Sequence, residues 1–275
     1  MTARMLVNGV ATEQISTRDR GFGYGDGLFE SIRLVGTVAP LWSRHMQRLA
    51  EGCARLKIPA PDPAQLSREA LEVSRELPQS VVRITITRGP GERGYAPPLS
   101  PQPSRVVAAF APPSVAAAVY AQGVRLRVCD IRLAEQPRLA GIKHLNRLEQ
   151  VLARAEWNDP DIAEGVLCDS HGRVISATMA NLFAVVDGEL LTPALDRCGV
   201  AGIGRAEVLA QCPQTRIAEL ALDTLRGASE VFLSSSVRGI VPVRWLDGCS
   251  YAPGVLNRRL QQHWRDLGFL MEQDG

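Results

Sequence analysis

Lysine is nearly absent from this chain of 275 residues. Arginine supplies almost all of the 31 basic side chains, and Lys57 and Lys143 are the two exceptions. Lysine differs from arginine because its amine can lose a proton and attack a carbonyl carbon. Lys57 follows a helical pattern and is interpreted as a cation at a helix C-terminus. Lys143 stands at the start of a helix-like run, where the helix dipole disfavours a structural cation, so a surface charge and a Schiff-base lysine both stay open.

Other absences narrow the class of protein. No apolar stretch approaches the roughly 20 residues that span a bilayer, and no signal peptide is apparent at the N-terminus. The net charge of +2 is too small to indicate binding to nucleic acid or to a membrane. The six cysteines have no C-x-x-C spacing. We therefore expect free thiols in a reducing cytoplasm, with neither a metal site nor a redox pair.

The composition, 45% hydrophobic and 22% charged, predicts a packed core, and the pattern predicts an α+β fold in two parts. The expected division is a small N-terminal α/β domain at 1–112, a linker at 113–120 and a larger strand-rich domain at 121–275. Turn signals at 169–172 and 187–188 predict hairpins, and 29–35 is expected to form another with 38–41. Helical periods are expected at 42–56, 63–77, 146–157, 204–211 and 255–267. Strands are expected at 81–87, 105–110, 124–129, 165–168, 182–186, 231–234 and 240–243.

Several glycine- or serine-rich stretches have the composition of ligand-binding segments. Residues 19–27 hold four glycines at alternate positions, which fits either close backbone packing or a wall that leaves room for a ligand. Two glycines within 200–205 open a predicted helix, where backbone N–H groups can hold a phosphate. Residues 231–236 end in three serines, which fit a second set of phosphate donors or a plain turn. The loop at 89–98 has three glycines and three prolines and is long enough for a binding role.

In this order, the motifs resemble the fold-type IV pyridoxal-phosphate (PLP) enzymes, a family that includes branched-chain and D-amino-acid aminotransferases and 4-amino-4-deoxychorismate lyases. Residues 19–30 (DRGFGYGDGLFE) match the opening motif of the group, and 45–49 (HMQRL) match its H-x-x-R-L. Residues 202–205 (GIGR) resemble its phosphate turn, and 230–236 (EVFLSSS) resemble its second phosphate strand. The resemblance covers about residues 5–245.

Two further motifs are most similar to those of the lyases. Residues 141–150 (GIKHLNRLEQ) are similar to their lysine segment, whereas branched-chain aminotransferases place Gly-Asn-Tyr after the lysine. Residues 88–95 (RGPGERGY) are similar to the lyase pattern R-G-x-G-x-R-G-Y. The resemblance implies a PLP-dependent conversion of 4-amino-4-deoxychorismate to 4-aminobenzoate and pyruvate, a step toward folate. Two alternatives stay open: an aminotransferase for D- or branched-chain amino acids, and a PLP-binding relative without catalysis.

The resemblance also implies roles for individual residues. Lys143 would attach the cofactor aldehyde and then act as a base on the substrate. Arg93, from this chain or from across a homodimer, would bind a substrate carboxylate, unless it is an ordinary surface charge. Tyr95 and Tyr24 would lie beside the substrate, and the cofactor would occupy a cleft between the two domains. The cofactor phosphate would be held by Arg48, Ile203, Gly204 and Ser236.

Two positions depart from the pattern of the family. In 172–183 (GRVISATMANLF), Ser176 stands where the family has the glutamate that pairs with the pyridine nitrogen of the cofactor. A serine hydroxyl can form a hydrogen bond but supplies no charge, so the ring should withdraw electrons less strongly. We expect the lyase reaction to tolerate this because elimination produces an aromatic ring; a slow enzyme, another substrate or a nearby acid are the alternatives. Gly204 replaces the threonine of the phosphate turn, which removes a hydroxyl and keeps the backbone donor.

Overall fold

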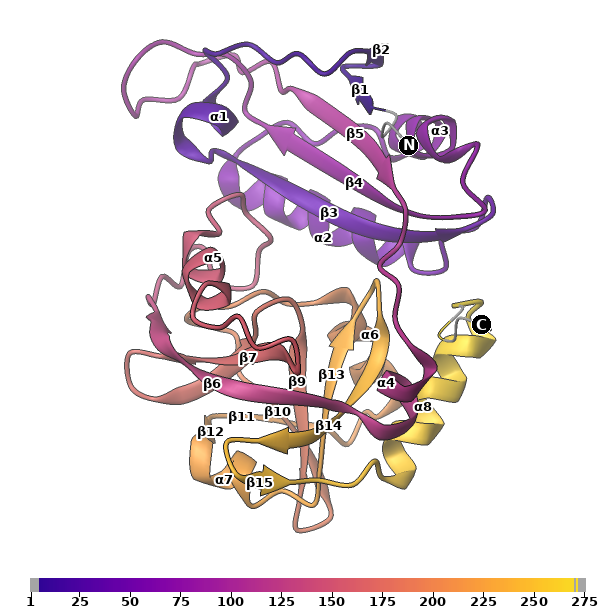
Figure 1. Cartoon of the computed structure of the whole chain (residues 1–275). Helices are drawn as coiled ribbons and strands as arrows, with labels where there is room; N and C mark the ends of the chain where they lie inside the picture. The colour runs from indigo at the N-terminus through magenta and orange to yellow at the C-terminus, as the bar shows by residue number, and fades with distance from the viewer. Residues whose placement is uncertain (1–4, 270, 272–275) are drawn as a thin grey trace. The chain divides into compact units, whose positions relative to one another are not determined.

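The computed structural model of the chain describes residues 5–269 and 271 (Figure 1). They divide into two compact units. The first unit contains the residues up to Pro112 together with the short segment Ile142–Asn146. The second contains Pro113–Gly141 and the chain from Arg147 onward. Lys143 therefore belongs to the first unit, although the chain before Ile142 and after Asn146 in the sequence belongs to the second.

The first unit is an antiparallel sheet in the order β2-β1-β5-β4-β3, with helices on one face (Figure 1). Helix α2 packs against β3, and α3 packs against β4 and β5. The strands are β1 (Met5–Val7), β2 (Val10–Ala11), β3 (Gly27–Val35), β4 (Gln79–Thr87) and β5 (Arg105–Phe110). The helices are α1 (Arg20–Tyr24), α2 (Trp42–Leu56) and α3 (Pro63–Ser74).

Side chains of β3 point alternately to the two faces of the sheet, and the helices cover the face that carries its most buried apolar residues. Leu28, Ile32 and Leu34 are each at most 2% exposed and point toward the helices. Helix α2 has the bounds that its sequence period predicts, and it ends at Lys57, whose left-handed backbone (φ 55°) forms the C-cap. The predicted position of Lys57 at a helix C-terminus is confirmed. Helix α3 begins where predicted, with Pro63 in its first turn, but ends at Ser74, three residues early.

The predicted hairpin between 29–35 and 38–41 is wrong. Strand β3 pairs instead with β4 over its full length, from Gly27 opposite Thr87 to Val35 opposite Gln79. Val38 forms only a single bridge to Val35. The segment 38–41 contains Pro40, which has no N–H to donate to a ladder, whereas β4 offers nine residues of matching alternation.

The second unit is a mixed sheet in the order β11-β10-β9-β13-β14-β6-β7-β8-β12, with β15 on β14 (Figure 1). The hairpins β7–β8 and β9–β10 turn at 169–172 and 187–188, as predicted. The strands are β6 (Val124–Leu133), β7 (Ile162–Asp169), β8 (Arg173–Ala177), β9 (Asn181–Val186), β10 (Glu189–Pro193), β11 (Arg216–Ala218), β12 (Leu220–Ala221), β13 (Glu230–Ser235), β14 (Gly239–Leu246) and β15 (Cys249–Ser250). The helices are α4 (Ala117–Gln122), α5 (Leu148–Arg154), α6 (Ile203–Gln211), α7 (Leu222–Arg226) and α8 (Val255–Asp266).

The α+β class predicted from the sequence is confirmed, because one sheet is antiparallel and the other combines both senses of pairing. Helix α4 begins inside the stretch 113–120 that the sequence marks as a linker. Helix α5 is shorter than the predicted 146–157. Within residues 5–269 and 271, no helix is long and apolar enough to cross a membrane.

Candidate functional site

Lys143 lies in an extended segment along the outer edge of β3. Its carbonyl accepts a hydrogen bond from the Phe29 N–H at 3.0 Å, and the Leu145 N–H donates to the Gly27 carbonyl at 3.0 Å. Helix α5 begins only at Leu148, so the expectation that Lys143 starts a helix is wrong. Strand pairing orients the side chain instead: Lys143 shares a face with Phe29, and its Nζ lies 4.4 Å from the centroid of that ring.

A buried carboxylate organises the cations between β3 and α2. Glu30 is 1% exposed, and its Oε2 lies 2.6 Å from His45 Nδ1. Arg48, one helical turn after His45, donates from Nε to Glu30 Oε1 at 2.8 Å. Burial alone would raise the pKa of Glu30, but the charge of Arg48 and the hydrogen bonds from His45 and Arg48 outweigh it and lower the pKa to about 2. The carboxylate therefore stays ionised and fixes both side chains.

Burial lowers the pKa of His45, and the charges of Arg48 and Lys143 act in the same direction against the opposing effect of Glu30. The imidazole is therefore held in its neutral form more strongly than in water. Lys143 and Arg48 thus act electrostatically on the same buried side chain within the first unit. Two nitrogens of Arg48 face Glu30, and its role as a phosphate ligand stays a prediction.

The glycine-rich stretch 19–27 supports the loop that carries Arg93 and Tyr95. Arg20 is 5% exposed and donates from its guanidinium to the carbonyls of Gly94 at 2.9 Å and Tyr95 at 3.1 Å. The Tyr24 hydroxyl accepts from the Gly94 N–H at 3.0 Å, and the rings of Tyr24 and Tyr95 lie 5.6 Å apart. The side chains of Arg93 and Tyr95 are exposed. The loop is therefore anchored through its backbone, and these two side chains remain accessible.

Close packing accounts for several glycines of this stretch, and Gly27 is the clearest case because the obstacle there is backbone. A Cβ at Gly27 would collide with the Ile86 carbonyl of the neighbouring strand. The packing interpretation therefore holds at this position, where β3 must approach β4 closely. At Gly23, by contrast, a Cβ would meet no atom within 4 Å, which leaves space beside α1.

The first turn of α6 in the second unit has the features of an anion site. Its N-cap is Gly202, which has no side chain to cap the helix. The N–H groups of Ile203 and Gly204 lie in the first turn, where a helix provides no acceptor of its own. Asn181 fixes the entry to the turn, because its Oδ1 accepts from the Gly202 N–H at 3.0 Å and its Nδ2 donates to the Val200 carbonyl at 3.0 Å. Such a terminus binds phosphate through its N–H groups and its dipole.

The serines at the end of β13 lie against this first turn. A Cβ at Gly204 would stand 2.9 Å from the Ser235 backbone nitrogen, so the departure from threonine coincides with a close approach of two backbones. Ser234 is 2% exposed, and its hydroxyl has no hydrogen-bond partner among the described residues. The unsatisfied buried hydroxyl at the end of β13 and the uncapped N–H groups at the start of α6 are donors of the kind that fit the phosphate of PLP. Ser236 follows directly in the β13–β14 turn.

Ser176 lies on β8 and is 8% exposed. A buried acid occurs nearby on β7: Glu164, which is fully buried, accepts from the Thr178 hydroxyl and from the Met179 N–H at 3.2 Å. Arg238 of the β13–β14 turn forms an ion pair with the same carboxylate. Glu164 therefore joins the turn after β8 to the turn that contains Ser236. Because these groups already engage it, we interpret Glu164 as a structural link between the two turns.

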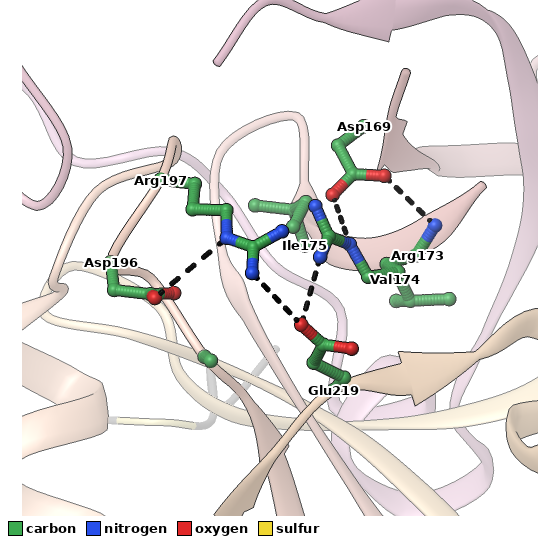
Figure 2. A pocket seen from close by; sticks show the side chains of 8 residues that line it. Asp169, Arg173, Val174, Ile175, Asp196, Arg197 and Glu219 are labelled. Carbon is green, nitrogen blue, oxygen red and sulfur yellow. Dashed lines mark hydrogen bonds and ion pairs between the residues drawn. The ribbon is translucent and has the colours of Figure 1, made fainter. Parts of the chain in front are cut away.

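A second cluster of charges, around Asp169, has no room for a substrate (Figure 2). Arg173 donates to Asp169 and Glu219, and Arg197 also contacts Glu219 (Figure 2). The enclosed volume is about 10 Å³, which is the space of a single water molecule. Glu135, Asp169 and His171 converge here as metal ligands would, but the guanidinium of Arg173 already pairs with both carboxylates. We therefore interpret the cluster as an ion-pair network.

Sequence reasoning missed several residues that hold the predicted site together. Glu30 and His45 were available from the sequence, because they are the last and first residues of two motifs already quoted. Asn181 likewise belongs to the N-L-F part of the family pattern. Arg20 also lies in a quoted motif, the one at 19–30, whereas Glu164 gave no signal, because its partners Thr178 and Arg238 are 14 and 74 residues away. The predicted site residues divide between the units: Lys143, Arg48, Arg93, Tyr95 and Tyr24 belong to the first, and Ser176, Ile203, Gly204 and Ser236 belong to the second.

Comparisons with known proteins identify the family and the fold. Residues 27–246 match the family model described as amino-transferase class IV. The chain is 36% identical to a Vibrio harveyi protein named aminodeoxychorismate lyase, over 93% of this chain and 97% of that one. The crystal structure of 4-amino-4-deoxychorismate lyase from Pseudomonas aeruginosa has a TM-score of 0.91 and 47% identity, covering 95% of this chain and 98% of that one. A branched-chain amino acid aminotransferase structure from Escherichia coli has a TM-score of 0.86 and 25% identity, covering 98% and 96%.

Proposed function

Because the chain belongs to the class IV amino-transferase family, we propose that it is a PLP-dependent lyase that converts 4-amino-4-deoxychorismate to 4-aminobenzoate and pyruvate. The observation that carries the proposal is the sequence identity to the Pseudomonas aeruginosa lyase, which is 47% over 95% of the chain, against 25% for the aminotransferase. The lysine segment 141–150, with its lyase-like sequence, lies within the region matched by the family model. The reaction is a step toward folate.

The residues fit the cofactor in both units. Lys143 would attach the cofactor aldehyde, and Arg48 would contact the phosphate together with Ile203, Gly204 and Ser236. The uncapped first turn of α6 and the unsatisfied Ser234 hydroxyl support phosphate binding there. Ser176 would face the pyridine nitrogen and offer it a hydrogen bond without a charge. When bound, the cofactor withdraws electrons from the carbon that carries the substrate nitrogen.

The chain's own residues then move one proton. The substrate amine replaces the amine of Lys143, and the freed Lys143 takes the proton from C4 of the substrate ring. The electron pair of that C–H bond enters the ring system as the C3–O bond breaks. The departing oxygen keeps the electrons of the C–O bond, and the resulting enolate takes a proton at its CH2 carbon to give pyruvate. The ring that remains is aromatic, and the return of Lys143 releases 4-aminobenzoate.

Arg93, Tyr95 and Tyr24 are the proposed substrate-binding residues. The anchoring of their loop by Arg20 supports this, since a fixed backbone lets a long exposed side chain meet a carboxylate with less loss of entropy. Arg93 would act in its own subunit or in a partner.

We also propose a homodimer. Leu148, Val151 and Leu152 are 75%, 59% and 58% exposed and share one face of α5 through their spacing of three and four residues. An apolar helix face of this kind suits burial against a second copy of the chain. The division into domains at 1–112 and 121–275 is likewise a proposal. So is a cytoplasmic location, which is supported by the six unpaired cysteines.

Borohydride trapping followed by peptide mapping tests the core of the proposal. The PLP-loaded protein should carry the reduced label on Lys143 and not on Lys57. A sample that has not been reduced should convert added 4-amino-4-deoxychorismate to 4-aminobenzoate and pyruvate in equal amounts. Label on Lys57, or no label, would overturn the assignment of the lysine.

The same preparation distinguishes the alternatives. An aminotransferase would give the pyridoxamine form of the cofactor when a D- or branched-chain amino acid is added alone, whereas the lyase would not. A PLP-binding relative without catalysis would show the cofactor absorbance and no turnover of any amine. Either result would replace the lyase assignment.

A further inference from the structure

Arg83 lies beside the lysine on the face of the first sheet opposite α2 and α3. On β3, Phe29 alternates with Leu28 and Glu30, which face the helices. On β4, Arg83 alternates in the same way with the fully buried Val82 and Ile84. In the register of the two strands, Arg83 pairs with Ser31, two residues along β3 from Phe29. Arg83 is therefore a diagonal neighbour of Phe29 on the same face of the sheet.

The Phe29 ring is shared by two cations. Its centroid lies 4.4 Å from Lys143 Nζ and 4.2 Å from the guanidinium carbon of Arg83. The distance between Lys143 Nζ and the guanidinium carbon of Arg83 is therefore at most the sum of these two distances. Lys143 approaches from the outer edge of β3, and Arg83 approaches from β4 on the inner side. Phe29 is 8% exposed, so its ring is held by the surrounding packing and both cations contact a fixed surface.

Arg83 has no anionic partner among the described residues. Other arginines of the first unit donate to carboxylates: Arg20 and Arg88 to Asp26, and Arg105 to Glu69. Arg83 makes no hydrogen bond or ion pair with any residue of 5–269 or 271, and its side chain is exposed. Its guanidinium therefore keeps all of its donors, held over an aromatic ring that limits its motion.

We propose that Arg83 binds the ring carboxylate of the substrate, which lies para to the amine that Lys143 exchanges with. The proposal rests on the lyase function and extends it to a second arginine, since the substrate has two carboxylates and Arg93 accounts for one. The amine and the ring carboxylate stand at opposite ends of one six-membered ring. Lys143 and Arg83 reach the Phe29 ring from the two opposite edges of β3, so a flat substrate ring stacked near Phe29 would present its two ends to the two cations. Arg83 then sets the orientation of the substrate and moves no proton.

The test uses the PLP-loaded protein and two probes besides the substrate. One probe is 4-aminobenzoate, which has only the carboxylate para to the amine. The other is the 4-hydroxy analogue of the substrate, which has both carboxylates and no amine. Calorimetric titration gives the Kd of each probe, and steady-state assays give KM and kcat for the substrate.

Arg83→Gln should raise the Kd of both probes and the KM by roughly 10- to 100-fold, the effect of one lost charged hydrogen bond pair, while kcat changes little. Arg83→Lys keeps the positive charge but loses the two parallel N–H donors of the guanidinium. Its Kd and KM values should therefore lie between those of the wild type and those of Arg83→Gln. Arg68→Gln is the matched control, because Arg68 is an exposed arginine of α3, on the helix-covered face of the sheet that is opposite to Arg83. The cofactor absorbance should be the same in all four proteins.

Two results would overturn the inference: unchanged probe binding in Arg83→Gln, or an equal loss in Arg68→Gln. Loss of the cofactor absorbance in Arg83→Gln would also overturn it, because Arg83 would then serve the cofactor or the fold. Failure of the lyase function gives a different result, in which the wild-type protein turns over no substrate. The Kd of 4-aminobenzoate still reports on Arg83 in that case.

Discussion

The two units differ in how their polar groups are matched. In the first unit, the buried carboxylate of Glu30 accepts hydrogen bonds from His45 and Arg48, so the charges are paired within the protein. In the second unit, α6 begins at a glycine without a capping side chain, and the Ser234 hydroxyl has no partner among the described residues. The first unit therefore fixes its reactive and cationic groups in advance, and the second presents donors for an anion that the protein does not supply. Changes in the first unit should act on chemistry and acid stability, and changes in the second should act on cofactor affinity.

The largest effect is expected at the lysine. Lys143→Ala should reduce lyase turnover by at least roughly 1,000-fold, because both the covalent attachment and the proton transfer are lost. Lys143→Arg should be as inactive although it keeps the charge over Phe29. Lys57→Ala is the control and should keep full activity, since Lys57 contributes a helix C-cap. Turnover and the borohydride label are the measurements; appreciable activity in Lys143→Arg would show that charge alone is needed.

The matched charges of the first unit predict a dependence of stability on pH. The pKa of Glu30 is about 2 in the folded protein, below its ordinary value of 4.5. A lowered carboxyl pKa stabilises the fold fully above the ordinary value, and that stability is lost as the pH falls through about 2. The shift corresponds to about 3 kcal/mol in the free energy of unfolding.

Urea unfolding at pH 7 and at pH 3 measures this contribution. The wild-type protein should lose about 2 kcal/mol more than Glu30→Gln between these pH values, because the glutamine has no proton to gain. Glu51→Gln is the control, since Glu51 is an exposed carboxylate on α2, the helix that carries the partners of Glu30. An equal loss in wild type and Glu30→Gln would mean that Glu30 is not the group whose protonation destabilises the first unit.

In the second unit, a larger side chain at position 204 in the predicted phosphate turn should lower both stability and the affinity for PLP. Gly204→Thr restores the residue of the family pattern, yet its Cβ would press on the Ser235 backbone. The expected cost is about 1–3 kcal/mol, seen as a lower Tm and as a roughly 10- to 100-fold rise in the Kd of PLP. Gly23→Thr makes the same change at a glycine with open space and should leave PLP affinity unchanged. Tighter PLP binding in Gly204→Thr would show that the turn has room for the hydroxyl and that the two backbones separate.

These contrasts also show which features the sequence could predict. Helix α2 was placed correctly because its apolar period is local and complete. The partner of β3 was not, because β4 and the Lys143 segment lie far away in the sequence and only the packed sheet selects them. The motif residues of the site were recognised as types, but their orientation depends on nonlocal contacts. The packing of Gly204 against Ser235 and the link from Glu164 to Arg238 are contacts of this kind, and a single sequence has no local signal for them.

The smallest effect is expected at Ser176, and it tests how much electron withdrawal the reaction needs. Ser176→Glu would restore the carboxylate of the family pattern at a position that is 8% exposed. A charge beside the pyridine nitrogen favours transamination, which requires a strong electron sink, so conversion to the pyridoxamine form with an added amino acid should become faster. Lyase kcat should change by less than roughly tenfold, because formation of the aromatic ring already drives the elimination. Ser176→Ala, which removes only the hydroxyl, is the control. If Ser176→Glu raises lyase kcat far more than this, the serine limits the rate, and the elimination depends on the electron sink as strongly as transamination does.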